Sequence, residues 1–216
     1  MKSDSQLQKD VLEELKWEPS IDHADIGVAV TDGVVTLSGI VRSYAEKLLA
    51  EQAAQRVDGV RALAEELIVR YPGQPQTSDT EIAKRVRDII SWDPLVPRNC
   101  VMVKVEKGLV TLHGTVEWRF QADRATRAAG RITGVTGVTD LVMIKPKVDA
   151  IGIRHRIEEA LKRHAMLDAS RINVMVDGHK VRLGGKVGSW QERNVVERAA
   201  WSAPGVSQIE DAIVVA

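Results

Sequence analysis

A short pattern of glycines and β-branched residues occurs three times in this chain of 216 residues. The first copy, in residues 33–41, reads Gly-Val-Val-Thr-Leu-Ser-Gly-Ile-Val, and residues 108–116 read Gly-Leu-Val-Thr-Leu-His-Gly-Thr-Val. The third copy, in residues 178–187, carries its first glycine one position earlier. Repetition at a regular spacing is a fold-level signal, so the chain is expected to consist of three copies of one unit.

The similarity extends over the whole length of each copy. A shift of 75 residues maps the first copy onto the second, and a shift of 71 maps the second onto the third. Gly39 thus corresponds to Gly114 and Gly185, and another glycine follows 20 residues later in every copy. A period this long indicates three small domains rather than a solenoid of open repeats.

Each copy predicts a helix, two strands, a second helix and a final strand. The first helix of copy one begins at Ser3 or Ser5 and ends before Pro19, and its apolar stripe at helical spacing consists of Leu7, Val11, Leu12 and Leu15. Asp79 or Thr80 is the expected N-cap of the corresponding helix in copy two. The sequence therefore predicts an α+β protein of three tandem αββαβ domains, each a three-stranded sheet with two helices packed on one face.

Two-residue turns join the first two strands of each domain, because glycine accepts the positive φ that such turns need. The turns are expected at Asp32-Gly33, Lys107-Gly108 and Asp177-Gly178. The second helix is rich in alanine on its sheet side, and Gly59 is expected to end it in a left-handed conformation. The patterns leave open whether the third strand pairs with the second strand or with the first.

Segments that contain proline separate the copies. Residues 71–78 and 145–149 have little apolar surface to bury, so we expect domains at residues 1–71, 78–147 and 149–216. A domain of about 70 residues hides only about 60% of its unfolded surface. We therefore expect the domains to dock on one another or on a partner.

The neutral total charge conceals domains of opposite sign. Residues 1–72 hold 8 basic and 13 acidic side chains, a net charge of −5, whereas residues 73–147 hold 12 and 8, a net charge of +4. Residues 148–216 hold 10 and 9. This asymmetry favours docking between the first two copies or a different partner for each. The neutral net charge of the whole chain and the lack of exposed stacking aromatics on its strands argue against nucleic-acid binding.

No arrangement of side chains indicates catalysis, a metal site or a cofactor site. Cys100 is the only cysteine, so no disulfide or thiolate cluster can form within one chain. The glycine-rich segment 184–188 fails as a phosphate-binding loop, because Lys180 and Val187 stand where glycine and a hydroxyl residue are needed. The five histidines have no partners at ligand spacing. We expect a non-enzymatic protein that holds neither metal nor cofactor.

Nothing in the sequence suggests a membrane span, since no segment approaches the required length of about 20 apolar residues. The first ten residues do not resemble a signal peptide. The expected location is cytoplasmic for the chain as it stands, and periplasmic if a leader was removed.

The repeated pattern resembles the BON domain family. The likeness rests on Gly-x-Val-Thr-Leu-x-Gly-x-Val, on a helix with Glu46, Ala53 and Ala54, and on Gly-Val before a final apolar strand. It extends through Ser43 and Tyr44 in the first copy and covers nearly the whole chain. The resemblance implies association with membranes, by contact with phospholipid, in envelope maintenance and osmotic stress. It implies no catalytic residues.

The second helix of copy two is the candidate lipid-contact site. Its residues are Trp118, Arg119, Arg124, Arg127 and Arg131, with Phe120 beside them. At 100° per residue the four arginines fall within an arc of about 140°. A basic face bordered by aromatic residues suits an anionic headgroup layer. The alternatives are a solvated charged face and a surface that docks on the acidic first copy.

Two tryptophans, Trp17 and Trp92, end the first helices of copies one and two. We interpret them as lids over the domain core rather than as membrane anchors. The function expected for the whole chain is interaction with phospholipid surfaces or envelope assemblies. The alternative is a protein adaptor or a self-assembling scaffold whose acidic and basic copies pair between chains. A third hypothesis is small-molecule binding in a cleft between domains.

Overall fold

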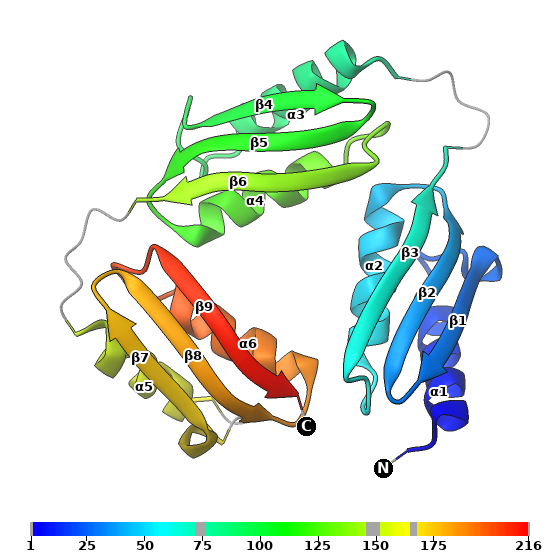
Figure 1. Cartoon of the computed structure of the whole chain (residues 1–216). Helices are drawn as coiled ribbons and strands as arrows, with labels where there is room; N and C mark the ends of the chain where they lie inside the picture. Colours follow the sequence, from blue (N-terminus) through cyan, green and yellow to red (C-terminus); the bar gives the residue numbers. More distant parts are fainter. Residues whose placement is uncertain (1, 72–76, 146–151, 165–167, 216) are drawn as a thin grey trace.

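The computed structural model describes residues 2–71, 77–145, 152–164 and 168–215, and it shows three domains (Figure 1). Domain 1 comprises α1 (Asp4–Trp17), β1 (Ile26–Thr31), β2 (Val34–Val41), α2 (Tyr44–Arg56) and β3 (Ala62–Val69). Domain 2 comprises α3 (Asp79–Trp92), β4 (Val101–Glu106), β5 (Leu109–Val116), α4 (Arg119–Gly130) and β6 (Gly137–Ile144). Domain 3 comprises α5 (Ile153–Lys162), β7 (Ile172–Asp177), β8 (Lys180–Val187), α6 (Trp190–Trp201) and β9 (Gln208–Val215). The expected linkers lie largely outside the described residues.

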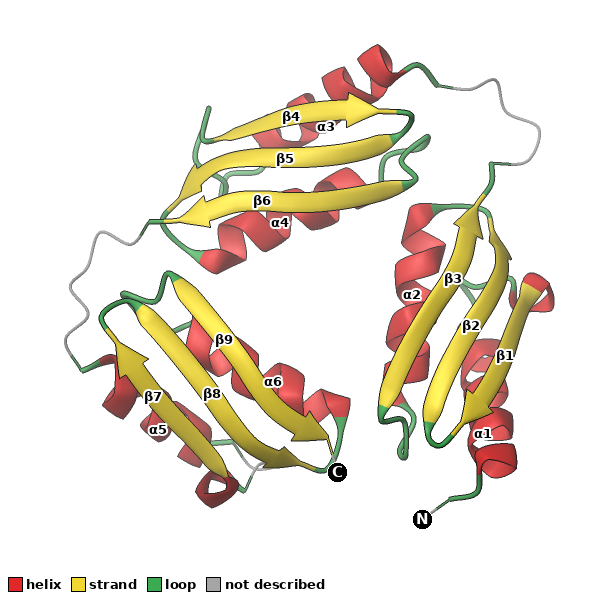
Figure 2. Cartoon of the chain, viewed as in Figure 1, coloured by secondary structure: helices red, strands yellow, loops and turns green. Residues whose placement is uncertain are grey.

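The second strand of each domain occupies the centre of its sheet. β2 pairs with β1 in antiparallel and with β3 in parallel orientation, and the other two sheets repeat this order. The third strand therefore pairs with the second strand, which the sequence had left open. Both helices of each domain pack on one face of the mixed sheet (Figure 2). The predicted fold class is confirmed.

Each domain has its own hydrophobic core between the sheet and the two helices. In domain 1 the predicted stripe residues Leu7, Val11 and Leu15 are buried against Leu37 of β2. The side chain of Ala53 in α2 is 0% exposed, and such small residues let the helix lie close to the sheet. No described helix is both long enough and apolar enough to cross a membrane.

The repeated strand glycine follows from a close backbone approach. Gly39, Gly114 and Gly185 have φ values of 124°, 139° and 123°. A Cβ atom at any of them would collide with a backbone carbonyl oxygen just before the first strand, that of Asp25 in domain 1. Only glycine combines this backbone conformation with that contact.

The helix caps differ in part from the expectation. Ser3 caps α1, but α3 is capped by Ser78, whose Oγ accepts a hydrogen bond from the Glu81 N–H at 3.3 Å. Asp79, an expected cap, instead accepts hydrogen bonds from the backbone N–H groups of Lys107 and Gly108 at 2.8 and 2.9 Å. Its carboxylate thus ties the start of α3 to the hairpin turn.

Two turns also differ from the expectation. In domain 3, Asp177 pairs with Lys180 within the strand ladder, so the turn is Gly178-His179 and not Asp177-Gly178. The positive φ of 55° occurs at Gly178, so in this domain the glycine occupies the first position of the turn. Gly59 has a φ of 98° but lies beyond the C-cap of α2, so it shapes the following turn and does not cap the helix.

The three domains surround a common centre, toward which α2, α4 and α6 are turned (Figure 1). Tyr44 at the start of α2 packs on the core of domain 2 and lies beside Gly130 at the end of α4. Arg119 at the start of α4 lies over Trp201 at the end of α6. Trp190 at the start of α6 packs on the core of domain 1. Since Tyr44, Arg119 and Trp190 are corresponding residues, one head-to-tail contact occurs three times and closes a ring.

The strand ends repeat the same arrangement. Val69 at the end of β3 and Gly108 of domain 2 line one hollow between domains. Val215 at the end of β9 and Gly33 of domain 1 line another. Val215 corresponds to Val69 and Gly33 to Gly108, so domain 3 meets domain 1 as domain 1 meets domain 2. Lys2 and Val215, the first and last described residues, line this second hollow together as a result.

Candidate functional site

The tryptophans that end α1 and α3 are the most exposed large apolar side chains in the described part of the chain. Trp17 is 85% exposed and Trp92 is 86% exposed. The interpretation of these residues as core lids is therefore wrong. Each follows a buried stripe residue, Leu15 or Ile90, by two positions, which is about 200° around the helix. The side chain consequently points away from the core.

Domain 2 presents a larger apolar tip than domain 1. Ile89 precedes Trp92 by one helical turn and is 38% exposed, and Leu95 in the following turn is 50% exposed. We call these three residues the α3 tip. The corresponding residues around Trp17 are Glu14 and Ser20, so domain 1 exposes a tryptophan without apolar neighbours at those positions.

A carboxylate holds the α3 tip against α4. Oδ2 of Asp93 accepts a hydrogen bond from Nε of Arg124 at 2.8 Å, and Oδ1 accepts one from the Leu95 N–H at 2.9 Å. The hydrogen bond from Arg124 lowers the pKa of the Asp93 carboxyl below its ordinary value. Arg124, predicted as part of the lipid-contact face, thus fixes the turn that carries the tip.

The other predicted arginines divide into engaged and open side chains. Nε of Arg119 pairs with Asp123 at 2.7 Å, and its Nη1 pairs with Asp140 at 3.2 Å. Arg127 and Arg131 are exposed, and neither forms an ion pair with any described residue. The basic face of α4 therefore offers two free cations rather than four.

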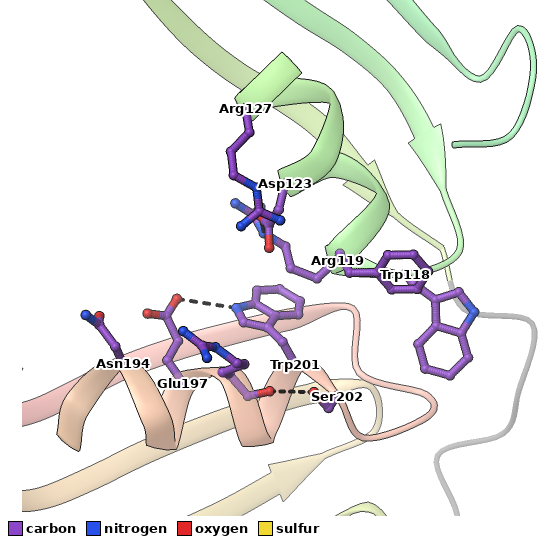
Figure 3. A pocket seen from close by; sticks show the side chains of 10 residues that line it. Trp118, Arg119, Asp123, Arg127, Asn194, Glu197, Trp201 and Ser202 are labelled. Carbon is purple, nitrogen blue, oxygen red and sulfur yellow. Dashed lines mark hydrogen bonds and ion pairs between the residues drawn. The ribbon is translucent and has the colours of Figure 1, made fainter. Parts of the chain in front are cut away.

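A cavity of about 500 Å³ lies between α4 and α6 (Figure 3). It is lined by Trp118, Arg119, Phe120, Asp123, Arg127, Asn194, Glu197, Arg198, Trp201 and Ser202. The guanidinium carbon of Arg119 is 5.5 Å from the Trp201 ring centroid, and the Trp201 indole N–H donates to Glu197 at 3.4 Å. Three of the five predicted site residues thus meet here, while Arg124 and Arg131 lie outside the cavity.

The residues that α6 contributes to this cavity were not predicted. No motif or periodicity relates Trp201 to Arg119, because the two lie in different copies. The repeat contained one signal for this cavity: Arg198 corresponds to Arg127, so α4 and α6 carry an arginine at corresponding positions. The described residues contain no group of three histidine, cysteine, aspartate or glutamate side chains placed to hold a metal ion.

The outer sheet faces of domains 1 and 2 carry few charges. In domain 1 this face consists of Gly27, Ala29, Thr31, Val34, Thr36, Ser38, Ile40, Ala62, Ala64, Glu66 and Ile68. In domain 2, Met102 and Leu141 flank His113 across the sheet, and Met143 follows. Met102 and Met143 are 66% and 67% exposed. These faces form the second candidate contact surface.

Comparison with known proteins agrees with the repeated architecture. The BON domain model matches residues 3–71, 78–146 and 151–216. The osmotically-inducible protein Y of Escherichia coli (strain K12) is 33% identical over 139 residues, which is 62% of this chain and 69% of that protein.

Solved structures show weaker likeness. CdsD, a structural protein of the type III secretion system of Chlamydia trachomatis, is 14% identical with a TM-score of 0.27, over 98% of this chain and 92% of that one. The periplasmic domain of PrgH is 11% identical with a TM-score of 0.24, over 95% and 99%. Scores this low carry no argument about the present chain. The BON domain model, in contrast, matches nearly the whole length of the chain. The chain therefore belongs to the BON domain family and consists of three BON domains in tandem.

Proposed function

We propose that this protein binds the surface of anionic phospholipid membranes through the α3 tip, and that it does so without catalysing a reaction. The observation that carries the proposal is the exposed indole of Trp92 on a tip fixed by Asp93. Tryptophan favours the boundary between water and lipid, because its ring is apolar and its N–H is polar. Ile89 and Leu95 add apolar area that water solvates poorly.

Charge supports the same orientation toward a membrane. The tip belongs to the domain with a net charge of +4. Arg131, the C-cap of α4, lies on the same side of that helix as Arg124 and about two turns beyond it, so it is an exposed cation of the same domain but does not adjoin the tip. Lys84 on α3 is a second exposed cation. Each such cation near an anionic surface contributes about 1 kcal/mol. In this proposal Trp118, Arg119 and Arg127 remain in the α4–α6 cavity and Arg124 positions the tip.

Osmotic stress is the proposed setting. The similar protein of Escherichia coli is named as osmotically inducible, and its alignment with this chain covers 69% of its length. A membrane-surface role under osmotic stress is tested by deleting the gene and comparing growth before and after an osmotic upshift. Complementation with the native chain, and failure with the Trp92→Ala chain, would link that phenotype to the α3 tip.

Vesicle co-sedimentation tests the membrane proposal directly. The native chain is expected to bind vesicles that contain phosphatidylglycerol, to bind neutral vesicles weakly, and to lose binding at high salt. Trp92→Ala should weaken binding at least tenfold, because transfer of a large apolar side chain from water contributes about 1.5–3 kcal/mol. Trp17→Ala is the matched control, since that indole is equally exposed but lacks apolar neighbours and lies in the acidic domain.

The charge contribution needs variants that leave the tip intact. Lys84→Glu/Arg131→Glu reverses two exposed cations without touching the pair between Arg124 and Asp93. These changes should abolish binding to anionic vesicles at low salt. If the native chain binds no vesicles under any condition, or if Trp17→Ala and Trp92→Ala behave alike, the α3 tip is not a membrane contact.

A scaffold function is the second candidate, and the apolar side chains exposed on the outer sheet faces, such as Met102 and Met143, favour it. Apolar surface that stays exposed on a folded domain commonly marks a contact with another protein. Self-association through these faces should appear by light scattering without lipid. Met102→Lys/Met143→Lys would suppress it while leaving the core of domain 2 unchanged. A native chain that stays monomeric at high concentration would exclude self-assembly.

A further inference from the structure

The three helix junctions of the ring use corresponding residues but differ in how tightly they close. At the junction of α2 and α4, a Cβ atom added to Gly130 would lie 3.2 Å from the ring of Tyr44. The residue that corresponds to Gly130 in α6 is Trp201, and the residue that corresponds to Tyr44 in α4 is Arg119. An indole thus stands where the tight junction has no side chain, and a cavity of about 500 Å³ remains beside it.

The charges in this cavity are unbalanced. Arg119 is engaged by Asp123, whereas Arg127 and Arg198 form no ion pair with a described residue. Glu197 is the other carboxylate of the lining, and it accepts the indole N–H of Trp201. Two exposed guanidinium groups therefore border an open, concave space with one carboxylate to oppose them, and a concave surface concentrates their field.

The same cavity offers apolar contact. Trp118, Phe120 and Trp201 line it together with the charged residues (Figure 3). The indole of Trp201 is held on one side by Arg119, so it presents a fixed ring to the cavity. Sites for small molecules in proteins commonly have volumes of about 300–1,000 Å³ and combine apolar walls with a few charged groups. The volume and the lining both fall within that description.

We propose that the α4–α6 cavity binds a small organic phosphate. The phosphate oxygens accept hydrogen bonds from Arg127 and Arg198, because the planar guanidinium fork matches a phosphate group in a bidentate manner. The organic part of the ligand packs against Trp201 and Phe120. This inference goes beyond the proposed membrane contact, since it involves a soluble ligand and different residues.

The test follows the indole N–H signals of the full-length chain by NMR during titration with phenyl phosphate. The chain has 5 tryptophans, so single Trp→Phe variants assign the signals. Phenyl phosphate should shift the signals of Trp118 and Trp201 and reach saturation, while those of Trp17 and Trp92 stay in place. Inorganic phosphate should bind at least tenfold more weakly, because it lacks the ring. Unsaturated or uniform shifts would overturn the proposal.

Variants separate a built site from general attraction between charges. Arg127→Gln/Arg198→Gln should weaken binding of phenyl phosphate at least tenfold, whereas Arg131→Gln, at the C-cap of α4 and outside the cavity, should leave it unchanged. Arg198→Lys keeps the charge and removes the fork, so an intermediate loss is expected. Equal affinity in all these variants would overturn the proposal. Should the double variant fail to give a native spectrum, Arg198→Lys alone decides.

The same titration tests whether the phosphate belongs to a lipid headgroup or to a soluble molecule. It also tests whether binding in the cavity is independent of the proposed membrane contact. Glycerol 3-phosphate represents the polar part of a phospholipid without an aromatic ring. Weaker binding than phenyl phosphate supports a soluble aromatic ligand, whereas stronger binding would overturn the role of the ring contacts. Trp92→Ala should bind phenyl phosphate like the native chain, and Arg198→Lys should bind vesicles like the native chain, so either proposal can fail alone.

Discussion

The helices α2 and α4 hold corresponding places in domains 1 and 2 and differ where they meet a neighbouring domain. α2 begins with Tyr44, which packs on the core of domain 2, and the nearby Tyr71 hydroxyl donates to the Val135 carbonyl at 2.8 Å. α4 begins with Arg119, which is ion-paired and lies over Trp201 of domain 3. The contact between helices α2 and α4 is apolar and closely packed, whereas the contact between α4 and α6 is polar and leaves a cavity.

This difference separates what holds a domain together from what a domain contacts. Both helices bury alanines against their own sheets, as Ala54 and the corresponding Ala129 show. Their outward positions differ, because the core of the helix's own domain does not depend on them. A repeated scaffold can therefore form two kinds of junction without any change in its fold.

The largest effect on the free energy of unfolding is expected from removing the Trp201 indole at the junction of α4 and α6. Trp201 packs against the core of domain 3 and stacks with Arg119. Trp201→Ala should lower the free energy of unfolding by about 3 kcal/mol, through lost burial and the lost cation–π contact. Urea unfolding followed by circular dichroism measures the change.

Trp17→Ala is the control for this change, because it removes the same side chain from a position that is 85% exposed. Its effect should stay within about 0.5 kcal/mol. Equal losses in the two variants would mean that Trp201 contributes no packing at the junction.

A smaller effect should distinguish α2 from α4 at corresponding alanines. Ala53 is 0% exposed, whereas Ala128 is partly exposed. Ala53→Leu should overpack the contact and destabilise the chain by about 1–3 kcal/mol. Ala128→Leu should cost less than about 1 kcal/mol, since part of the larger side chain can extend into solvent. The order of the two urea midpoints checks the prediction, and a reversed order would contradict it.

The domain interiors could be predicted from the sequence because burial leaves a periodic pattern. Leu7, Val11 and Leu15 are buried as their spacing predicted. The hairpin at Asp32-Gly33 has the positive φ values of 53° and 77° that its residues indicated. Both features depend on neighbours within one domain.

The candidate sites were less accessible to that reasoning. The contact between Arg119 and Trp201 depends on how two rigid domains dock, and no residue period reports docking. Trp92 is different: its place about 200° from Ile90 on the helix is a feature of the sequence that favours exposure, and the interpretation as a core lid did not take it into account. The large aromatic side chain suggested a core lid, but the angle around the helix determines that it is exposed, and the structure corrects the interpretation.

The close packing between α2 and α4 can be tested by replacing Gly130 of α4 with a larger residue, since α6 carries a large side chain at the corresponding position. Glycine inside a helix is usually destabilising by about 1 kcal/mol, so its replacement would ordinarily stabilise the chain. At Gly130 the added Cβ meets the Tyr44 ring at 3.2 Å and approaches Leu48 at 3.8 Å. Gly130→Leu should therefore destabilise the chain by about 1–2 kcal/mol.

A double-mutant cycle identifies the cause. In a Tyr44→Ala background the ring is absent, and Gly130→Leu should become neutral or stabilising. Destabilisation that persists in that background would assign the effect to α4 alone and not to the junction.

The smallest effect concerns a contact that α4 makes and α2 does not. Arg124 and Asp93 correspond to Leu49 and Glu18 in domain 1. Because Arg124 lowers the pKa of Asp93 in the folded chain, the pair stabilises the chain fully above the ordinary value of 3.8. That contribution is lost as the pH falls below 3.8 toward the lowered pKa.

Replacement of Arg124 by the residue that α2 carries tests this contact. Arg124→Leu should lower the free energy of unfolding at pH 7 by less than about 1 kcal/mol, since the pair is partly exposed. The gap to the native chain should shrink as the pH falls below the ordinary value of 3.8, as measured by urea unfolding at a series of pH values. Asp93→Asn should show the same convergence, because it removes the titrating group from the pair. A gap that stays constant over this range would mean that Arg124 supports the α3 tip by packing rather than by charge, and α4 would then resemble α2 at this position.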